Sequence, residues 1–155
     1  MGLLMEKEIE NVHLNHYKPI VAIFGAAKIK DKLPLFKKLL AKVDKLILGG
    51  GVVFTFLKAG GIEVGKSLVE EEMVEEAKKL LDKYSKKIIF PTDFTGSTPA
   101  QLKKWSTFSA AEKKEAIKIV PVENIPKSFA CYDVGPQSLK LFKAVLSNSK
   151  TVIWN

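Results

Sequence analysis

The chain has 155 residues, of which 46% are hydrophobic and 27% charged, a balance that predicts one water-soluble globular domain. No apolar run approaches the roughly 20 residues needed to cross a bilayer, so we expect a cytoplasmic protein without a membrane partner. The single cysteine, Cys131, excludes an internal disulfide and suits a reducing compartment. One cysteine and two histidines also disfavour a structural zinc site.

The formal net charge is +8, and all 25 basic residues are lysine. Without arginine the chain cannot form bidentate guanidinium contacts, so an anion must be bound by lysine ammonium groups and backbone amides. The lysines are spread along the chain and interleaved with glutamate, which is typical of a solvated surface. Nucleic acid is therefore not expected as a partner.

The order of apolar runs and amphipathic segments predicts the fold. Residues 3–12 have the pattern of a short amphipathic helix. Continuous apolar runs predict buried strands at 19–24, 45–48, 87–91, 117–122, 129–134 and 151–154. Helical patterns lie between them at 31–42, 67–84 and 138–146. Residues 52–59 are a further helix closed by glycine, with a strand as the alternative.

Two of these segments carry more detail. The helix at 67–84 should begin with a capping box formed by Ser67 and Glu70. Residues 92–116 break the alternation and predict a polar loop with one or two short helices, the second capped by Ser109 and Glu112. Strands that alternate with helices indicate an α/β fold, a Rossmann-like, mainly parallel sheet with helices on both faces.

Residues 60–67 (GGIEVGKS) match the P-loop pattern GxxxxGK[ST] at every position. A P-loop leaves a buried strand and enters a helix whose amides stay free for phosphate. Here Glu63 lies inside the loop and three further glutamates follow it, and these carboxylates would repel an anion. We therefore interpret the segment as a glycine-rich turn with Ser67 as an N-cap. A P-loop nucleotidase that uses Lys66 and Ser67 is the alternative.

Residues 24–32 (FGAAKIKDK) follow the most strand-like run and directly precede a helix. Small residues let backbone amides approach a ligand, and Lys28 and Lys32 share one face of the first helical turn. Phosphate would meet two ammonium groups, free amides and the positive end of the helix. The glycines at 49–51 also end a strand and open a helix, so two adjacent strand ends predict a nucleotide crevice. A structural turn before a lysine-rich helix is the alternative.

The order of these motifs resembles phosphoglycerate kinase. The resemblance covers nearly all of the chain, is weakest at 92–116, and rests on GLLMEKE, PIVAIFGAAKIKDK, KLILGGGVVFTFLKA, IEVGKSLVEEE, a strand ending in P-x-D, IVPV, YDVGPQS and TVIWN. It implies that 1–17 is an interdomain helix and linker. Residues 18–155 would be part of the nucleotide-binding C-terminal lobe, an incomplete three-layer lobe.

The resemblance implies reversible phosphoryl transfer in glycolysis between 1,3-bisphosphoglycerate and ADP, giving 3-phosphoglycerate and ATP, with Mg²⁺. Lys28 would be the catalytic lysine that accompanies the transferred phosphoryl group, and Lys32 would contact the α-phosphate. The nucleotide-binding residues would be Gly25, Ala26, Ala27, Lys28, Lys32, Gly49, Gly50 and Asn155.

The rest of the machinery would lie elsewhere in a monomeric full-length enzyme. In the family, the triose site is on the N-terminal lobe, and the magnesium-linked aspartate follows the segment matched here. No metal ligand is therefore expected among these residues, and the chain alone is expected to be inactive.

Two departures from the family pattern bear on binding. Ala26 stands where the family has a second glycine, and its methyl group is expected to face the nucleotide and weaken binding. The aromatic that faces adenine cannot be aligned, and the candidates are Phe94, Trp105 and Phe108. A rival interpretation is a divergent, non-catalytic nucleotide-binding or interaction module that kept the fold.

Overall fold

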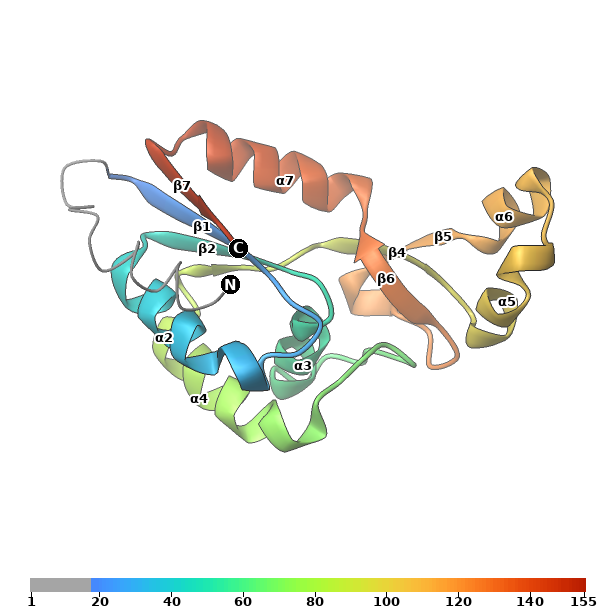
Figure 1. The fold of residues 1–155 in the computed structure, drawn as a ribbon, viewed down its shortest axis with the longest axis horizontal. Coiled ribbons are helices and arrows are strands. Elements are labelled where there is room, and N and C mark those ends of the chain that lie inside the picture. Colours follow the sequence, from blue (N-terminus) through green and yellow to red (C-terminus); the bar gives the residue numbers. More distant parts are fainter. Residues whose placement is uncertain (1–17) are drawn as a thin grey trace.

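The structure is a computed structural model that describes residues 18–155, so the helix and linker predicted at 1–17 lie outside the described residues. Within that range the chain forms two sheets flanked by helices (Figure 1). The larger sheet is parallel, in the order β3-β2-β1-β7, and consists of β1 (Ile20–Gly25), β2 (Lys45–Gly49), β3 (Ile88–Ile89) and β7 (Thr151–Trp154). The smaller sheet is antiparallel, in the order β5-β4-β6, and consists of β4 (Asp93–Ser97), β5 (Lys118–Pro121) and β6 (Ala130–Val134). The predicted α/β fold with a parallel sheet is confirmed, whereas the separate antiparallel sheet was not predicted.

Helices cover both faces of the parallel sheet. On one face lie α2 (Leu33–Lys42), α3 (Val52–Ala59) and α4 (Val74–Tyr84), and on the other lies α7 (Pro136–Ser147) (Figure 1). The short helices α5 (Pro99–Lys103) and α6 (Ala110–Ala116) lie beyond the antiparallel sheet. Across residues 18–155, none of the helices combines the length and the apolar character that a bilayer span requires.

Three phenylalanines pack against one another in the core between the parallel sheet and helices α2 and α3. Phe24 of β1 and Phe36 of α2 have ring centroids 5.0 Å apart, and Phe36 lies 5.2 Å from Phe56 of α3. All three side chains are fully buried, and each such burial contributes about 1.5–3 kcal/mol to stability. This stack fixes α2 and α3 against the end of β1 and so positions the loops that follow β1 and β2.

The helix predicted at 67–84 begins later, at Val74, after a 3₁₀ turn at Glu71–Met73. Ser67 and Glu70 do not form the predicted capping box. The Ser67 hydroxyl instead accepts a hydrogen bond from the backbone amide of Cys131 at 3.0 Å, and the Glu70 side chain contacts the segment after β1. The apolar side chains of this segment pack on the core, through Val69, Met73, Ala77, Leu80 and Tyr84.

The polar loop predicted at 92–116 contains β4, the central strand of the antiparallel sheet. The strand was missed because its sequence, DFTGS, is polar, whereas its burial comes from pairing with β5 on one edge and β6 on the other. The two short helices predicted there are α5 and α6. Ser109 and Glu112 form the predicted capping box at the start of α6.

A buried carboxylate joins the antiparallel sheet to α7. Asp93, at the start of β4, accepts hydrogen bonds from the backbone amides of Gln137 (3.0 Å) and Ser138 (2.7 Å) and from the Ser138 hydroxyl (2.6 Å). Burial by itself raises the pKa of Asp93, but these hydrogen bonds together outweigh it and lower the pKa below its ordinary value. The carboxylate therefore caps the first turn of α7 and fixes its orientation.

Candidate functional site

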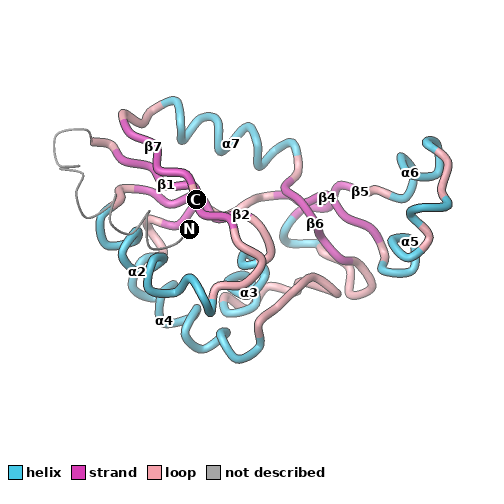
Figure 2. Tube along the Cα trace, viewed as in Figure 1, coloured by secondary structure: helices cyan, strands magenta, loops and turns pink. Residues whose placement is uncertain are grey.

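The carboxyl ends of three parallel strands meet at one edge of the larger sheet. Gly25 at the end of β1 pairs in register with Gly49 at the end of β2. Asn155 lies directly after β7. Its backbone amide donates a hydrogen bond to the carbonyl of Ile23 at 3.0 Å, and its backbone carbonyl accepts one from the amide of Gly25 at 3.0 Å. The loops after β1 and β2 leave the sheet at this same edge (Figure 2). The structure thus brings together three segments that are distant in sequence.

Two lysines predicted to bind phosphate lie at this edge. Lys32 donates from Nζ to the side-chain oxygen Oδ1 of Asn155 at 3.2 Å, across 123 residues of sequence. Lys28 is exposed, and within the described part of the chain its ammonium group has no hydrogen-bond or ion-pair partner. Its charge is therefore available to an anion at this edge of the sheet.

The two glycine-bearing loops pack backbone to backbone. The amide of Val52 donates to the carbonyl of Ala26 at 3.0 Å. Gly50 has a φ of +70°, and a Cβ placed on it would lie 2.7 Å from the same carbonyl oxygen. No atom lies within 4 Å of a Cβ built on Gly49, so this residue borders open space. Gly50 is therefore required by the fold, whereas Gly49 leaves room for a ligand.

The methyl group of Ala26 was expected to face the nucleotide. In the structure Ala26 is half-buried, and it packs against the hydrophobic core next to the carbonyl contact with Val52. Its two neighbours, Gly25 and Ala27, are exposed. Gly25 and Ala27 therefore present more surface to a ligand than Ala26 does.

Free backbone amides were expected in the segment after β1, and two amides of this segment are occupied. The carboxylate of Glu70 accepts hydrogen bonds from the amides of Ile29 and Lys30, the second at 3.5 Å. The preceding amides, of Ala26, Ala27 and Lys28, have no hydrogen-bond partner within residues 18–155. The amides that remain available to phosphate are therefore those of Ala26–Lys28, within the predicted small-residue turn.

Sequence reasoning missed Glu70 as a residue of this region. It assigned Glu70 to a cap of its own helix, because a serine followed three residues later by glutamate is a common helix start. The actual partners are 41 and 40 residues away. No local pattern carries that information.

The segment that matches the P-loop pattern has the wrong context. A helix, α3, precedes it in place of a strand, and Gly60 closes that helix as predicted. The amide of Lys66 donates to the carbonyl of Phe129 at 2.7 Å, and Ser67 binds the amide of Cys131. The segment is a glycine-rich turn that supports β6, and the P-loop interpretation is contradicted.

None of the aromatic candidates for adenine lies at this edge. Phe94 is 2% exposed and packs against Phe54, with ring centroids 5.0 Å apart. Trp105 and Phe108 belong to the α5–α6 region, which lies on the far side of the antiparallel sheet from the end of β1 (Figure 1). The ammonium group of Lys113 lies over the ring of Trp105, 5.7 Å from its centroid.

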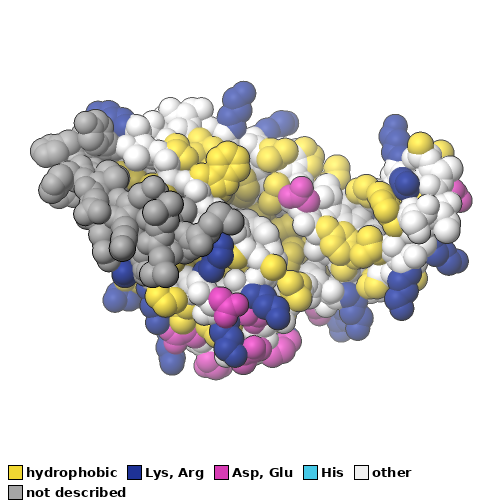
Figure 3. Space-filling model, viewed as in Figure 1, with side chains coloured by type: hydrophobic (Ala, Val, Ile, Leu, Met, Phe, Trp, Pro, Cys, Tyr) yellow, Lys and Arg dark blue, Asp and Glu magenta, His cyan; other side chains and the backbone are white. Residues whose placement is uncertain are grey.

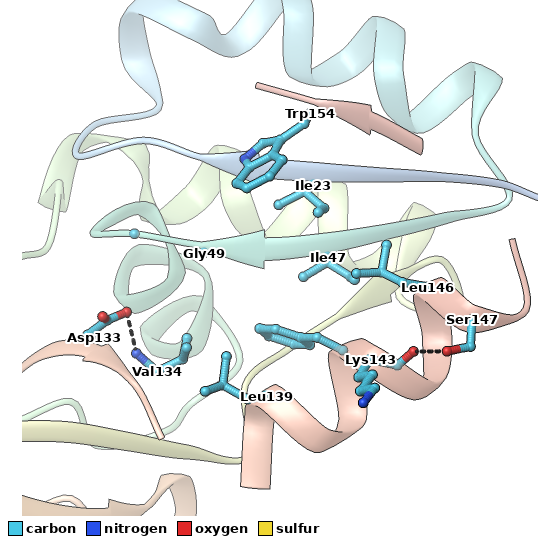
Figure 4. Close-up of a pocket in the computed structure, with 12 residues that line it drawn as sticks. Ile23, Ile47, Gly49, Asp133, Val134, Leu139, Lys143, Leu146, Ser147 and Trp154 are labelled. Carbon is cyan, nitrogen blue, oxygen red and sulfur yellow. Dashed lines mark hydrogen bonds between the residues drawn. The ribbon is translucent and has the colours of Figure 1, made fainter. Parts of the chain in front are cut away.

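An apolar cavity of about 770 Å³ adjoins the strand ends, between the sheet and α7 (Figure 4). It borders Gly49 and Gly50, and its apolar wall is formed mainly by Ile23, Ile47, Leu139, Phe142, Leu146 and Trp154. Trp154 is 77% exposed. Hydrophobic side chains gather on the surface along this side of α7 (Figure 3). Flat apolar groups could enter here directly beside the glycine loop.

The described residues offer no metal centre. Within 18–155 there is no group of three or more His, Cys, Asp or Glu side chains that could hold a metal ion. The carboxylate nearest the cavity, Asp133, accepts a hydrogen bond from the amide of Val134 at 2.8 Å (Figure 4).

Comparison with known proteins identifies the family. The phosphoglycerate kinase family model matches residues 1–155. Phosphoglycerate kinases of Campylobacter jejuni subsp. doylei and Staphylococcus aureus are 41% and 42% identical to the chain, over 99% of its length. The structure of phosphoglycerate kinase from Coxiella burnetii matches 99% of the chain with a TM-score of 0.78 and 30% identity.

A second solved structure, of phosphoglycerate kinase from Pyrococcus horikoshii, has a TM-score of 0.67 at 22% identity and supports the fold alone. The chain spans 37% of the length of the two curated relatives and 38% of the two solved chains. The family model and the relatives nevertheless match it nearly from end to end. The chain belongs to the phosphoglycerate kinase family.

Proposed function

We propose that the chain is the nucleotide-binding part of a phosphoglycerate kinase. The whole enzyme would transfer a phosphoryl group between 1,3-bisphosphoglycerate and ADP, giving 3-phosphoglycerate and ATP in glycolysis. The observation that carries the proposal is the contact of Lys32 with Asn155 beside two glycine-bearing strand ends, with the exposed Lys28 three residues after the first of them, in a member of this family. Ligands of open α/β sheets commonly bind at this edge.

The residues have distinct roles in the proposal. Lys32 contacts the α-phosphate, and Asn155 holds the Lys32 ammonium group at the strand ends. Lys28 faces the transferred phosphoryl group. The unpartnered amides of Ala26–Lys28 donate to phosphate oxygens, and the apolar cavity beside Gly49 and Gly50 accepts the adenine base.

The transfer needs charge neutralisation and positioning from these residues and no proton shuttle. The bond between phosphorus and the C1 carboxylate oxygen of 1,3-bisphosphoglycerate breaks while a β-phosphate oxygen of ADP bonds to the same phosphorus. The leaving group departs as a carboxylate. Ammonium groups and amides that are already oriented lower the cost of bringing these anions together.

The nucleotide enters this proposal as its magnesium complex, as the family resemblance implies. The triose substrate would bind on another lobe of the whole enzyme. Catalysis then requires two lobes that close around both substrates and exclude water.

Calorimetric titration of the purified chain with Mg-ADP, together with a coupled assay of ATP and 3-phosphoglycerate, tests the proposal. We expect Mg-ADP to bind and turnover to stay at the level of a Lys28→Ala control. Failure of the wild-type chain to bind Mg-ADP would contradict the proposed site. Turnover above the control would contradict the requirement for a second lobe.

A further inference from the structure

One buried carboxylate connects both loops of the proposed nucleotide site without facing the ligand. Glu70 is 5% exposed. Its Oε2 accepts a hydrogen bond from the backbone amide of Ile29, and its Oε1 accepts one from the backbone amide of Lys30. Its own amide donates to the hydroxyl of Thr55, on α3, at 3.0 Å. Glu70 thus holds the segment after β1 against the helix that follows the glycines of β2.

Loss of these hydrogen bonds would cost considerable free energy. A carboxylate removed from water is costly unless hydrogen bonds compensate it, and charge-assisted hydrogen bonds are stronger than neutral ones. Two consecutive amides directed at one carboxylate restrict the backbone dihedral angles between them. The restricted residues directly follow Lys28, so the direction in which Lys28 leaves the backbone depends on Glu70.

Glu70 also determines which amides remain for a ligand. It occupies those of Ile29 and Lys30, so a phosphate must use the preceding set at Ala26–Lys28. A phosphate bound one residue later would displace a buried carboxylate and leave it without partners. The carboxylate therefore defines the register of the anion site along this loop.

We propose that Glu70 is a positioning residue of the nucleotide site. It orders the Lys28–Lys30 backbone so that the Lys28 ammonium group and the preceding amides meet the phosphates without rearrangement. The inference rests on the proposed function, because it concerns the same site. Preorganisation of this kind removes an ordering cost that would otherwise weaken binding.

The principal test is Glu70→Gln, with Glu71→Gln as the matched control. A carboxamide has one acceptor oxygen, so in either orientation its NH₂ group is directed at an amide that needs an acceptor. Glu71 is exposed and pairs only at the surface with Lys58, at 2.6 Å. In Mg-ADP titrations we expect Glu70→Gln to weaken affinity about tenfold and Glu71→Gln less than about twofold.

A double-mutant cycle separates positioning from general stability. Because Glu70 is proposed to act through the Lys28 segment, Glu70→Gln should cost clearly less affinity in a Lys28→Ala background. A merely structural effect would be equal in both backgrounds. Leu80→Val, a truncation in the core part of α4, lowers stability by another route and should leave Mg-ADP affinity within about twofold. Amide hydrogen exchange at Ile29 and Lys30 should accelerate in Glu70→Gln alone.

A second variant serves if Glu70→Gln does not fold. Thr55→Val removes only the hydroxyl that accepts the Glu70 amide, while Thr55→Ser keeps it. We expect about a threefold loss of Mg-ADP affinity for valine and none for serine.

The failures are distinguishable. If the wild-type chain binds no Mg-ADP, the proposed function fails and this inference falls with it. If the wild-type chain binds and Glu70→Gln binds equally well, the inference alone is overturned. The inference is also overturned if the affinity losses in the double-mutant cycle are strictly additive. If Glu70→Gln does not fold, the inference is overturned when Thr55→Val binds Mg-ADP as tightly as the wild type.

Discussion

The role of Lys32 gives the most quantitative prediction. In the structure Lys32 is half-buried, and its Nζ lies 3.2 Å from the neutral side-chain oxygen of Asn155. Among residues 18–155, Lys32→Ala therefore breaks no ion pair. We expect it to cost the fold only about 0.5–1.5 kcal/mol, the net contribution of one ordinary hydrogen bond. The charge of Lys32 remains available for a ligand.

For Mg-ADP the expected loss is much larger. A charge-assisted contact between the ammonium group and phosphate is worth about 1.5–3 kcal/mol, which corresponds to roughly a tenfold to hundredfold loss of affinity for Lys32→Ala. Asn155→Ala should cost less, because it removes only the group that orients Lys32. The two changes should be non-additive, since both act on one contact.

The assay is calorimetric titration of Mg-ADP at one fixed salt concentration, with Lys66→Ala as the control. Lys66 is exposed in the glycine-rich turn that supports β6, and we expect its replacement to change affinity by less than about twofold. A large loss of Mg-ADP affinity in Lys66→Ala with none in Lys32→Ala would refute the proposed role of Lys32 and would indicate that phosphate binds at residues 60–67.

Three further predictions concern the framework. Asp93→Asn should lower the free energy of unfolding at pH 7 by about 1–3 kcal/mol, because one carboxamide oxygen cannot accept the three donors that surround the carboxylate. Since the folded-state pKa of Asp93 is lowered, this stabilisation is fully present above its ordinary pKa of 3.8 and should disappear as pH falls through the folded value, as urea unfolding at several pH values would measure. Gly50→Ala should cost about 1–3 kcal/mol in urea unfolding, because alanine is strained at a φ of +70° and its Cβ would lie 2.7 Å from the carbonyl of Ala26. Burial raises the pKa of the Cys131 thiol, more than its hydrogen bond with Ser67 lowers it, so iodoacetamide should alkylate it at pH 8 far more slowly than a small-molecule thiol until urea unfolds the chain.

Each of the three has a clear contrary result. A stability difference for Asp93→Asn that stays constant from pH 7 to pH 2 would contradict the lowered pKa. A fully stable Gly50→Ala variant would contradict the close contact between the two loops. Rapid alkylation of Cys131 in the folded chain would contradict the burial of this side chain.

The elements that sequence predicted best are those whose burial is visible locally. The continuous apolar runs at 19–24 and 45–48 became β1 and β2, because a strand buried on both faces of a parallel sheet carries apolar residues at successive positions. The run at 151–154 became β7, the edge strand of the sheet, in which Val152 and Trp154 are exposed. Strand β4 was missed for the opposite reason. Most of its residues are polar or glycine, and its burial comes from two neighbouring strands and from contacts with α3 and α7 that lie far away in sequence.

The site was predictable to a similar extent. A strand, a small-residue turn and a helix, found twice, predicted that Gly25 and Gly49 would meet at one edge of the sheet. The placement of Asn155 beside them came only from the family resemblance, because 123 residues separate it from Lys32. Glu70 was misassigned since its partners lie in another segment, and no periodicity of a single helix encodes such a contact.

The most direct test of the proposed nucleotide site at the ends of β1, β2 and β7 is to map Mg-ADP binding residue by residue, from backbone amide chemical shifts of the ¹⁵N-labelled chain. We predict that the largest, saturable shift changes occur at Gly25–Lys32, at Gly49–Gly51 and at Asn155, and that the changes at 60–67 are small. Largest shifts within 60–67, or saturable binding that leaves Gly25–Lys32 unchanged, would contradict it.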